Sequence, residues 1–385
     1  MARVLVVATA GAGGDLQPLV AAALALRDRG HETLFIGDRS VERTLAGLGF
    51  AVEALAPEHD LGPNLVAAIR EAMAVSDGDM GRAGPLVQQR MTTWAQAAAV
   101  PVAAAVAAAR AELVVTSLFG VEVLAGVAPA CPWAVVNSTF YVGAQPPRPL
   151  ESDFGLRAVP LIARFASLVD AADLVLHATD AIFDLGFEGL PPGHHYVGPL
   201  GIWEPPGDPP GYLDEPGPPW VLVTISSQLQ DDLPLLEAAL AAAAERPVRV
   251  VATVGPDHAP GEVASVPANA RLESTVSHAA VLERGALMVS HAGHGSVMKA
   301  LWYGRPMVLV PWGRDQPGVA ARAEALGVAK VVPRDEADVD SLAAAVDLCL
   351  GDRAMHAAAA HHGERLRATS PPAVAADLLE SLLDH

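Results

Sequence analysis

The sequence predicts an α/β protein made of two doubly wound parallel sheets, each covered by helices on both faces. Short β-branched runs alternate with longer alanine- and leucine-rich stretches along most of the chain. This alternation is interrupted once, by a segment dense in proline and glycine, and then starts again. A length of 385 residues exceeds what one hydrophobic core normally serves. Fully apolar strands joined by helices indicate parallel pairing, because both faces of such a sheet are buried.

The first half of the chain predicts a domain spanning residues 1–202. Its apolar runs are VLVVATA, ETLFIG, ELVVTS, WAVVNS and DLVLHA, and the helical stretch after the first run ends on Gly30, where a C-cap glycine is expected. Residues 91–109 carry no charge over a membrane-spanning length. They are mostly alanine and include threonine, glutamine and proline, so we expect a partly buried helical hairpin rather than a membrane span.

Residues 203–219 are dense in proline and glycine and are interpreted as an extended linker between domains. A second domain is predicted over residues 220–370, with the runs WVLVTIS, VRVVATVG, ALMVSHAG, PMVLVPWG and VAKVV. Residues 371–385 predict a final helix with no strand after it, which is free to pack on the first domain.

Charge and cysteine content exclude several classes of function. The formal net charge of −19 argues against a nucleic-acid binder and against docking on anionic lipid. Cys131 and Cys349 lie far apart and show no metal-ligand spacing, which favours free thiols in a reducing, cytoplasmic compartment. We expect no metal and no resident cofactor.

The second domain carries the densest chemistry, in a glycine-rich turn between a strand and a helix. Ligands of open parallel sheets bind beyond the carboxyl ends of the strands. His291, Gly293, Gly295 and Ser296 follow such a strand and open a helix. The N–H groups of Gly295, Ser296 and Val297 would lie at the positive end of the helix dipole, which suits a diphosphate.

Polar residues also follow the next strand of the second domain. Asp315 and Gln316 offer two acceptors and an amide donor at this strand end, which suits the hydroxyl groups of a sugar. His294, inside the glycine-rich turn, either touches the phosphate or fills space beside the start of the helix. These residue types together suit a diphosphate and the hydroxyl groups of a sugar.

The segment from residue 289 to residue 322 resembles the nucleotide-sugar signature of the family 1 glycosyltransferases, the large GT-B group. GAGGDLQPL, near the N-terminus, is similar to the opening turn of the bacterial members, and NARLESTVSHAAVLERG resembles the segment that precedes the signature. The resemblance runs in order through nearly the whole chain. It implies an inverting, metal-independent sugar transfer in natural-product or antibiotic biosynthesis.

The resemblance also implies which residues hold the sugar donor. These are Ser226, Ser227, Val276, His278, His291, Gly293, His294, Gly295, Ser296, Asp315 and Gln316. Plant members carry a glutamate that grips the ribose where this chain has Lys299. The nucleobase therefore cannot be carried over, and UDP and dTDP are both admissible.

Asp15 stands in the opening turn where most of the family places a histidine. The attacking acceptor hydroxyl must lose a proton as it bonds to the anomeric carbon, and a carboxylate can accept that proton. We therefore predict Asp15 as the general base, weakened by the adjacent helix N-terminus, which stabilises the ionised form. The alternative is that Asp15 only caps the helix.

No partner carboxylate for Asp15 is evident from the sequence. Thr116 and Ser117 end the run ELVVTS, and Glu122 follows further on. We interpret Thr116 and Ser117 as ordinary polar residues at a strand end rather than as part of a catalytic dyad.

The acceptor is expected to bind in the first domain. The candidate contacts are Gly14, Trp94, Phe119 and Phe140, within a region that includes residues 57–84 and 137–149. Their apolar and aromatic character suits a polyketide, macrolide, sterol or phenol. For Trp94 and Phe119, a place in the hydrophobic core is the simpler interpretation.

Two other functions remain open from the sequence. A GT-B sugar-nucleotide epimerase would turn over its nucleotide sugar without an acceptor. A non-catalytic relative that activates a partner enzyme would not need the acid, histidine and Asp-Gln pair found here. Assembly as a homodimer is also left open.

Overall fold

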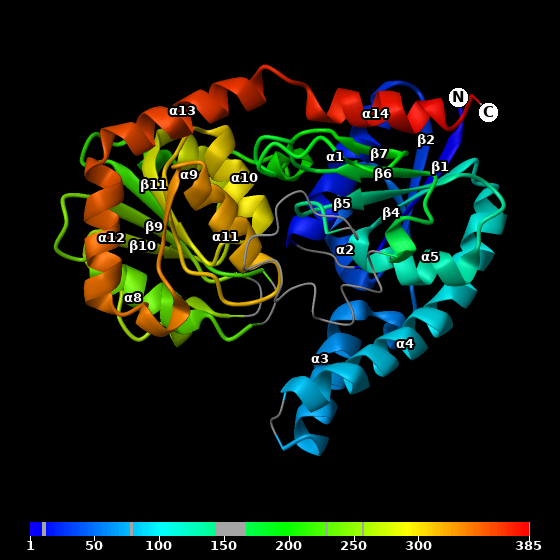
Figure 1. The fold of residues 1–385 in the computed structure, drawn as a ribbon, viewed down its shortest axis with the longest axis horizontal. Coiled ribbons are helices and arrows are strands. Elements are labelled where there is room, and N and C mark those ends of the chain that lie inside the picture. Colours follow the sequence, from blue (N-terminus) through cyan, green and yellow to red (C-terminus); the bar gives the residue numbers. More distant parts are fainter. Residues whose placement is uncertain (10–12, 78–79, 143–166, 228–229, 256–257, 385) are drawn as a thin grey trace. The chain divides into compact units, whose positions relative to one another are not determined.

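The computed structural model describes residues 1–9, 13–77, 80–142, 167–227, 230–255 and 258–384 (Figure 1). The chain divides into two compact units, each with its own sheet. The first comprises Met1–Ala181, Gly186–Leu200 and Ser370–His385, and the second comprises Ile182–Leu185 and Gly201–Thr369.

The described part of the first unit contains a seven-stranded sheet in the order β3-β2-β1-β4-β5-β6-β7, and all its paired strands are parallel. The strands are β1 (Arg3–Ala8), β2 (Glu32–Gly37), β3 (Ala51–Ala54), β4 (Leu113–Ser117), β5 (Trp133–Asn137), β6 (Leu174–His177) and β7 (His194–Tyr196). The central strands are buried almost throughout because helices cover both faces.

Helices of the first unit form a layer on each side of this sheet (Figure 1). The helices are α1 (Leu16–Asp28), α2 (Arg39–Leu45), α3 (Leu61–Val75), α4 (Met80–Ala109), α5 (Val121–Val127) and α14 (Pro371–Ser381). The side chains of Leu5 and Val7 point from β1 into the core formed with α4 and α5. Neighbouring residues of a strand point to opposite faces, so the other face of β1 is left for α1.

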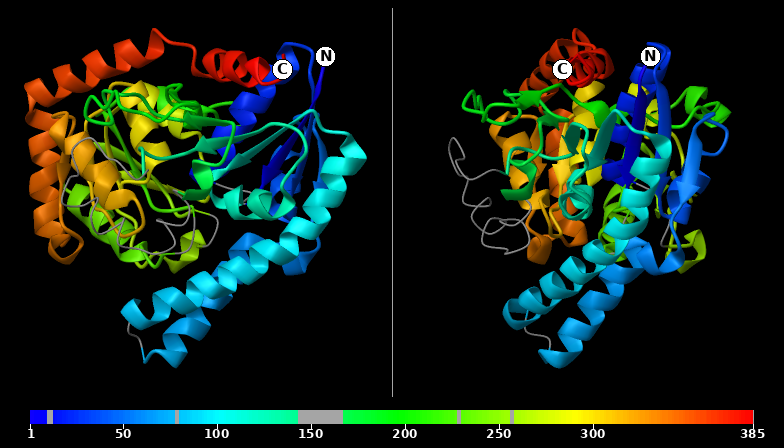
Figure 2. Two further views of the ribbon diagram at one scale, coloured as in Figure 1. Left: turned by 45° about the vertical axis from the view of Figure 1, so that its right-hand side comes forward. Right: turned by 90° about the vertical axis from the view of Figure 1, so that its right-hand side faces the viewer.

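Helix α14 packs along α1, although most of the chain separates the two helices in sequence (Figure 2). The Arg29 guanidinium donates to the Glu380 carboxylate at 2.6 Å and to the carbonyl of Ala373 at 3.0 Å. His31 Nε2 lies 2.8 Å from the other oxygen of Glu380. Apolar residues of α14, including Leu379, are fully buried, so this helix completes the core of the first unit.

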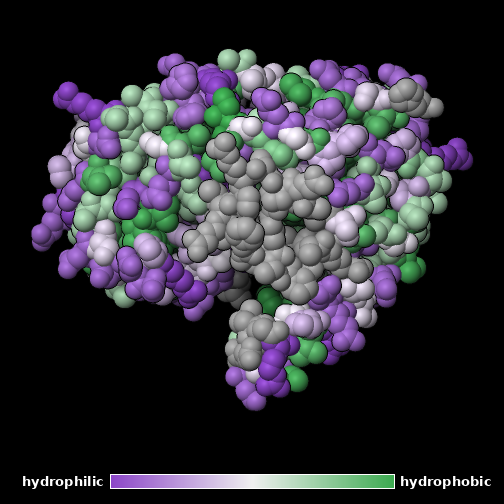
Figure 3. All heavy atoms as spheres, in the orientation of Figure 1, coloured by the Kyte–Doolittle hydropathy of each residue, from purple (hydrophilic) through white to green (hydrophobic). Residues whose placement is uncertain are grey.

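Helices α3 and α4 form a long hairpin (Figures 1 and 2). The segment Arg82–Ala109 is long and apolar enough to cross a membrane by length and composition alone, and part of it is buried against the sheet. Val75 and Val100 are apolar side chains that remain exposed on the hairpin. The face of the molecule seen in Figure 3 mixes hydrophilic and hydrophobic residues. The predicted hairpin therefore forms between α3 and α4, rather than within residues 91–109.

The described part of the second unit contains a six-stranded sheet in the order β10-β9-β8-β11-β12-β13, also parallel throughout. The strands are β8 (Trp220–Thr224), β9 (Arg249–Thr253), β10 (Ala270–Glu273), β11 (Gly285–Ser290), β12 (Met307–Leu309) and β13 (Ala329–Val331). The helices are α8 (Leu233–Ala243), α9 (His278–Arg284), α10 (His294–Trp302), α11 (Gln316–Ala325), α12 (Val339–Gly351) and α13 (Arg353–Arg367). Helices α8 and α12 bury their apolar residues against one face of this sheet.

The predicted fold class is confirmed, and each of the ten apolar runs contains a strand. Strands β3, β7 and β10 were not predicted. All three lie at sheet edges, and most of their residues are exposed or half-buried, so they lack the apolar run that marks a central strand.

The segment interpreted as a linker lies with the second unit from Gly201 onward. Leu213 is 3% exposed, and its carbonyl accepts a hydrogen bond from Trp220 Nε1 at 3.1 Å. Tyr212 Oη donates to Glu273 at 3.1 Å. Aromatic and leucine side chains thus hold part of this proline-rich segment against the second unit.

Candidate active site

Asp15 lies at the carboxyl end of β1, in the short turn Gly13–Asp15 that leads into α1. Its side chain is buried, with 4% of the residue exposed. Strand β4 pairs directly with β1, which brings Ser117 to the same sheet edge. Ser117 Oγ donates a hydrogen bond of 2.5 Å to Asp15 Oδ2. The other oxygen, Oδ1, is buried without a hydrogen-bond partner among the described residues.

Burial raises the pKa of Asp15 from 3.8 to about 6, although the hydrogen bond from Ser117 lowers it in part. The sequence predicted the opposite direction, because it considered the helix dipole and not the loss of water. That expectation is wrong: removing the carboxylate from water disfavours its charged form by more than the nearby donors favour it. Asp15 is therefore a stronger base than an exposed aspartate.

The capping alternative for Asp15 is also wrong. Asp15 precedes α1 with helical dihedral angles, φ −87° and ψ −38°, and its side chain makes no capping hydrogen bond. The carboxylate is directed instead to Ser117, which the sequence interpretation had set aside as an ordinary residue at a strand end. Thr116 Oγ1 donates to the carbonyl of Val7 at 2.9 Å, so it does serve the sheet. Glu122 Oε1 accepts a hydrogen bond from Thr92 at 3.0 Å.

The candidate acceptor contacts of the first unit lie mostly inside its core. Trp94 is 7% exposed, and its Nε1 donates to the carbonyl of His59 at 2.9 Å. Phe140 is fully buried, and Phe119 is half-buried against two core clusters. Gly14, beside Asp15, is half-buried. Trp94 and Phe119 thus occupy the core positions that the simpler interpretation assigned to them, and their acceptor role stays a prediction. Residues 78–79 and 143–149 of the predicted acceptor region lie outside the described residues.

His291 begins the turn after β11 in the second unit and is 7% exposed. Burial lowers its pKa to about 4, so the imidazole is neutral near pH 7. Nδ1 is buried without a hydrogen-bond partner in the described structure. A Cβ atom at Gly293 would lie 2.5 Å from His291 Nε2, so any larger residue there would displace the imidazole. Ala292, between His291 and Gly293, has a positive φ of 67°, which turns the chain toward α10.

Helix α10 begins after Gly293, which has an extended conformation and supplies no side-chain cap. The N–H group of Val297 donates to the carbonyl of Gly293 at 3.0 Å, so the prediction that it faces a ligand is wrong. The amides of His294, Gly295 and Ser296 precede this first intrahelical bond, as is general for the first turn of a helix. Gly295 and Ser296 are half-buried. This turn retains the geometry for binding an anion.

His294 packs inside the second unit. It is 6% exposed, and its ring meets Phe183 edge-on with the centroids 5.9 Å apart. Burial lowers its pKa to about 3. Asp184, next to Phe183, accepts a hydrogen bond of 2.9 Å from the fully buried Arg322. These contacts match the space-filling role that the sequence left open for His294, and they leave a role toward phosphate untested.

Gln316 ties together the loops that follow β8 and β12. Its Oε1 accepts hydrogen bonds from the backbone N–H groups of Trp312 and Gly313 at 2.8 and 3.0 Å. Its Nε2 donates to Gln230 Oε1 at 2.8 Å. Protein groups therefore engage both ends of the amide that was predicted to bind a sugar. Gln316 holds the loop that carries the neighbouring Asp315, and its direct contact with a sugar stays a prediction.

Asp232 anchors the loop after β8 and was not identified from the sequence. It is 1% exposed and accepts hydrogen bonds from Ser226 N–H and from Gln230 Nε2, both at 2.8 Å. Because Gln230 also accepts from Gln316, one chain of hydrogen bonds links the loops after β8 and β12. Strand β11 lies between those two strands in the sheet. The candidate donor residues Ser226, Ser227 and Asp315 therefore lie on two connected loops near the turn of His291.

A second unpredicted feature is a buried ion pair between Glu204 and Lys299. Lys299 Nζ lies 2.5 Å from Glu204 Oε1, and both side chains are largely buried. Glu204 also accepts from Ser277 Oγ at 2.7 Å and from the N–H group of Ala279 at 3.3 Å. Despite its burial, its pKa is lowered by the charge of Lys299 and by these donors. The proline-rich segment 203–219, which was interpreted as a linker, thus supplies the Glu204 carboxylate to the start of α9.

His278 begins α9, beside this ion pair. Its Nε2 lies 3.2 Å from Thr253 Oγ1. Burial and the nearby charge of Lys299 lower its pKa to about 4. Val276, on the same approach to the helix, is half-buried. Of the two residues predicted to run along the nucleoside, His278 thus contacts the end of β9 from the start of α9, and Val276 lies in the loop between β10 and α9. The His278 imidazole is electrically neutral near pH 7.

Comparison with known proteins gives matches over most of the second unit and over nearly the whole chain. Residues 237–382 match the model of the C-terminal domain of erythromycin biosynthesis protein CIII-like proteins. The chain is 32% identical over 223 residues to 4'-demethylrebeccamycin synthase of Lentzea aerocolonigenes, a match that covers 57% of this chain and 52% of that protein. It is 27% identical over 413 residues to O-mycaminosyltylonolide 6-deoxyallosyltransferase of Streptomyces fradiae, which covers 94% of this chain and 93% of that protein. The match to the first of these relatives thus spans only about half of its length.

Solved structures share the fold at low sequence identity. The glycotransferase of kitacinnamycin has a TM-score of 0.72 at 20% identity, covering 99% of this chain and 98% of that one. Spinosyn rhamnosyltransferase SpnG, complexed with thymidine diphosphate, has a TM-score of 0.71 at 21% identity, covering 96% of this chain and 98% of that one. At these identities the likeness establishes the architecture alone.

Proposed function

The chain belongs to the family 1 glycosyltransferases of the bacterial natural-product type and has their GT-B fold, and from this premise we propose that it transfers a sugar from a nucleoside diphosphate to a hydroxyl group of a small lipophilic acceptor. The acceptor class would be a polyketide, macrolide, other antibiotic aglycone, sterol or phenol. The similarity to 4'-demethylrebeccamycin synthase and to O-mycaminosyltylonolide 6-deoxyallosyltransferase supports this class.

The observation that carries the proposal is the state of Asp15. Its carboxyl group is buried, its pKa is raised to about 6, and its Oδ1 has no hydrogen-bond partner among the described residues. At pH 7 to 8 such a group is mostly ionised and still basic enough to accept a proton. General-base efficiency is greatest when the pKa lies close to the working pH. Ser117 would hold Oδ2 and leave Oδ1 to receive the proton of the acceptor hydroxyl.

The proposed step is a single displacement. The acceptor oxygen bonds to the anomeric carbon while its proton passes to Asp15. The bond between that carbon and the diphosphate oxygen breaks, and its electron pair leaves with the diphosphate. One displacement inverts the anomeric configuration.

The second unit would receive the leaving diphosphate at the first turn of α10. The amides of Gly295 and Ser296 lie at the positive end of the helix dipole, which favours a developing negative charge. His291 is neutral, so it would act there as a hydrogen-bonding group and not as a cation. Asp315 would accept from the hydroxyl groups of the donor sugar, on a loop that Gln316 holds in place.

We further propose that the nucleotide is dTDP. SpnG, which shares this fold, has been solved with thymidine diphosphate and with spinosyn aglycone. Lys299 is engaged by Glu204, so it is not a counterpart of the carboxylate that grips the ribose in plant relatives. UDP is the alternative that the experiment must separate from dTDP.

The test combines nucleotide binding with transfer. Calorimetry with UDP and dTDP, followed by mass spectrometry with their glucose conjugates and a panel of aglycones, would identify the donor and the acceptor class. We expect Asp15→Asn to bind dTDP as the wild type does and to lose about 10²- to 10⁴-fold in transfer rate. The control is Asp28→Asn, an exposed carboxylate of the same helix.

Each component of the proposal has a contrary outcome. Transfer by Asp15→Asn at the wild-type rate would exclude Asp15 as the base. Turnover of the nucleotide sugar without any acceptor would indicate an epimerase. Absence of binding to both nucleotides would indicate a non-catalytic relative.

A further inference from the structure

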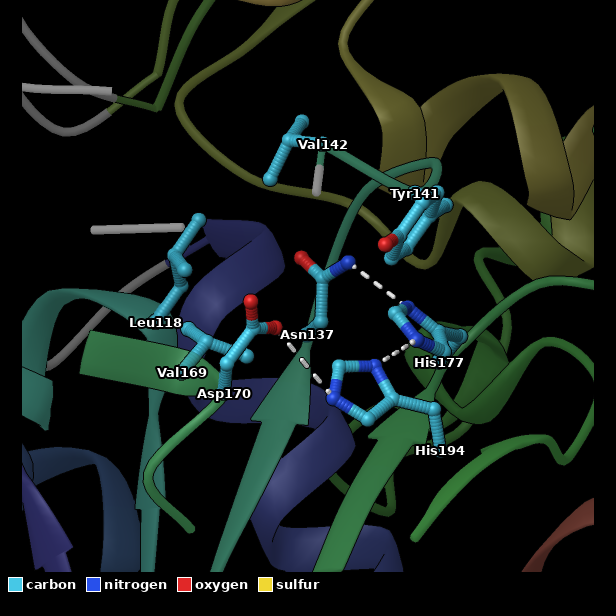
Figure 4. A pocket seen from close by; sticks show the side chains of 8 residues that line it. All are labelled: Leu118, Asn137, Tyr141, Val142, Val169, Asp170, His177 and His194. Carbon is cyan, nitrogen blue, oxygen red and sulfur yellow. Dashed lines mark hydrogen bonds and ion pairs between the residues drawn. The ribbon is translucent and has the colours of Figure 1, made fainter. Parts of the chain in front are cut away.

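Two buried polar clusters are not used by the proposed transfer step. The first lies in the first unit, where Asn137 Nδ2 is 2.9 Å from His177 Nδ1 and His177 Nε2 is 3.2 Å from His194 Nδ1 (Figure 4). The space beside these side chains is no larger than a water molecule, and the surface that lines it is apolar. We therefore assign this cluster to the packing of β5, β6 and β7.

The second cluster is carried by a short segment between β6 and β7, Ile182–Leu185. These residues belong to the second unit, although the chain that precedes them and the chain that follows them belong to the first. The N–H group of Gly186 donates to the carbonyl of Ala181 at 2.7 Å, and that of Leu185 donates to the carbonyl of Ile182 at 3.1 Å. Leu185 and Gly186 have positive φ angles of 59° and 75°. The segment is therefore a closed turn with a defined conformation.

Asp184 of this turn brings a fully buried charge to α11. Its Oδ1 accepts a hydrogen bond of 2.9 Å from Arg322 Nε, and the two side chains are 0% and 1% exposed. Arg322 Nη1 also lies 3.2 Å from the carbonyl of Gly318, one turn earlier in α11. A buried charge that loses its partner is strongly unfavourable, because water cannot reach it. The ion pair therefore fixes the turn against α11.

Phe183 of the same turn packs on the first residue of α10. The Phe183 ring is fully buried and meets the His294 ring edge-on, with the centroids 5.9 Å apart. Nε2 of His294 is buried without a hydrogen-bond partner among the described residues, so packing and not a hydrogen bond holds this end of the imidazole. The backbone amide of His294 is the first of those that precede the first intrahelical bond of α10. Movement of its side chain would therefore also move the start of the helix.

We propose that Phe183 and Asp184 are positioning residues of the nucleotide site, which act through His294 and Arg322 to hold the first turn of α10 and helix α11 in the arrangement that binds the diphosphate. The two side chains are neighbours on one turn, so a shift of either helix would disturb both contacts. Gln316, the first residue of α11, holds the loop that carries Asp315. That the turn receives a diphosphate rests on the proposed function, whereas its support by Phe183 does not.

The test compares dTDP with thymidine, which lacks the diphosphate. Calorimetry on the full chain gives both dissociation constants, and the constant for thymidine divided by that for dTDP isolates the contribution of the diphosphate. We expect Phe183→Ala to lower this ratio about tenfold and to leave the affinity for thymidine unchanged, since one misplaced charge-assisted hydrogen bond costs about that factor. An unchanged ratio would overturn the proposal.

Leu240→Ala is the matched control for loss of core packing. Leu240 is fully buried in the core that α8 and α12 form on the second sheet, so its truncation also destabilises the second unit. We expect its ratio to equal that of the wild type. An equal fall of the ratio in Leu240→Ala and Phe183→Ala would show that general loosening of the unit is the cause, and would overturn the positioning role.

Asp184→Asn separates the two contacts of the turn. This variant leaves Arg322 buried without its counter-charge, so the ratio should fall as it does in Phe183→Ala. An unchanged ratio in the folded variant would remove Asp184 from the proposal. Circular dichroism reports whether each variant is folded. If Phe183→Ala does not fold, Phe183→Leu keeps most of the apolar volume without the ring, and its ratio should fall in the same direction.

Hydrogen exchange tests the support of the turn without any ligand. The amide of Val297 donates to the carbonyl of Gly293 at 3.0 Å, so its exchange reports opening of the first turn of α10. We expect this exchange to be about tenfold faster in Phe183→Ala and unchanged in Leu240→Ala. Faster exchange in a chain whose wild type does not bind dTDP would contradict the proposed function and leave the support of the turn standing. Binding of dTDP by the wild type, with neither ratio nor exchange changed in Phe183→Ala, would overturn this inference alone.

Discussion

The raised pKa of Asp15 predicts that the proposed base destabilises the folded protein at neutral pH. Its folded pKa is about 6, against an ordinary value of 3.8. Between these values the folded state keeps a proton that the unfolded chain has lost, so the free energy of unfolding falls as pH rises through this window. A shift of about two units at 1.36 kcal/mol each gives about 3 kcal/mol by pH 7. Below pH 3.8 the carboxyl group is protonated in both the folded and the unfolded state, so this destabilisation is absent.

Asp15→Asn tests this reasoning because the amide is close in shape and cannot ionise. We expect thermal unfolding of the wild type and the variant to coincide at pH 4 and to separate at pH 8, with the variant more stable by up to about 3 kcal/mol. For a unit of about 200 residues this corresponds to a rise of roughly 6–12 °C in the melting temperature of the first unit. Asp28→Asn, on the exposed end of α1, should show no such separation. A difference that is the same at both pH values would refute the argument.

Three further substitutions follow from the contacts of the two units. Ser117→Ala removes the hydrogen bond that lowers the pKa of Asp15, so the acidic limb of the pH–rate profile should move to higher pH; an unmoved limb would contradict this. Gln316→Leu frees the loop after β12, and calorimetry should show roughly tenfold weaker binding of dTDP with little change in melting. Glu204→Gln leaves Lys299 buried without its counter-charge, and denaturant unfolding should show a loss of roughly 3–5 kcal/mol in the second unit; an unchanged midpoint would exclude this.

Sequence periodicity was sufficient for the central strands and for the edge strand β13, but not for the edge strands β3, β7 and β10. Runs such as VLVVATA are apolar at every position because both faces of the strand are covered. Strand β3 has mostly exposed residues and no such run, so nothing in its composition distinguishes it from a loop. The same limit explains the proline-rich segment, whose anchoring depends on single residues such as Leu213.

The candidate site was predictable where residues are close in sequence, and unpredictable where partners come from distant segments. The turn from His291 to Ser296 is local, and its position at a helix start could be inferred directly. Glu204 forms an ion pair with Lys299, which is 95 residues away in the sequence. Ser117 donates a hydrogen bond to Asp15, which is 102 residues away. The pairing of Asp15 with Ser117 could have been inferred, because a doubly wound sheet places the fourth strand beside the first. The burial that sets the pKa of Asp15 could not, because it depends on the packed environment of the turn.

The position of α14 has a consequence for how the protein is made. The first unit is built mostly from residues that precede the second unit in the chain, yet Leu379 and the Glu380 contacts to Arg29 and His31 belong to it. Domains generally begin to fold as they are synthesised, in order from the N-terminus. Here the apolar face of α1 must wait for α14 while all of the second unit is translated. During that interval the nascent first unit exposes a surface that chaperones or a second nascent chain can bind.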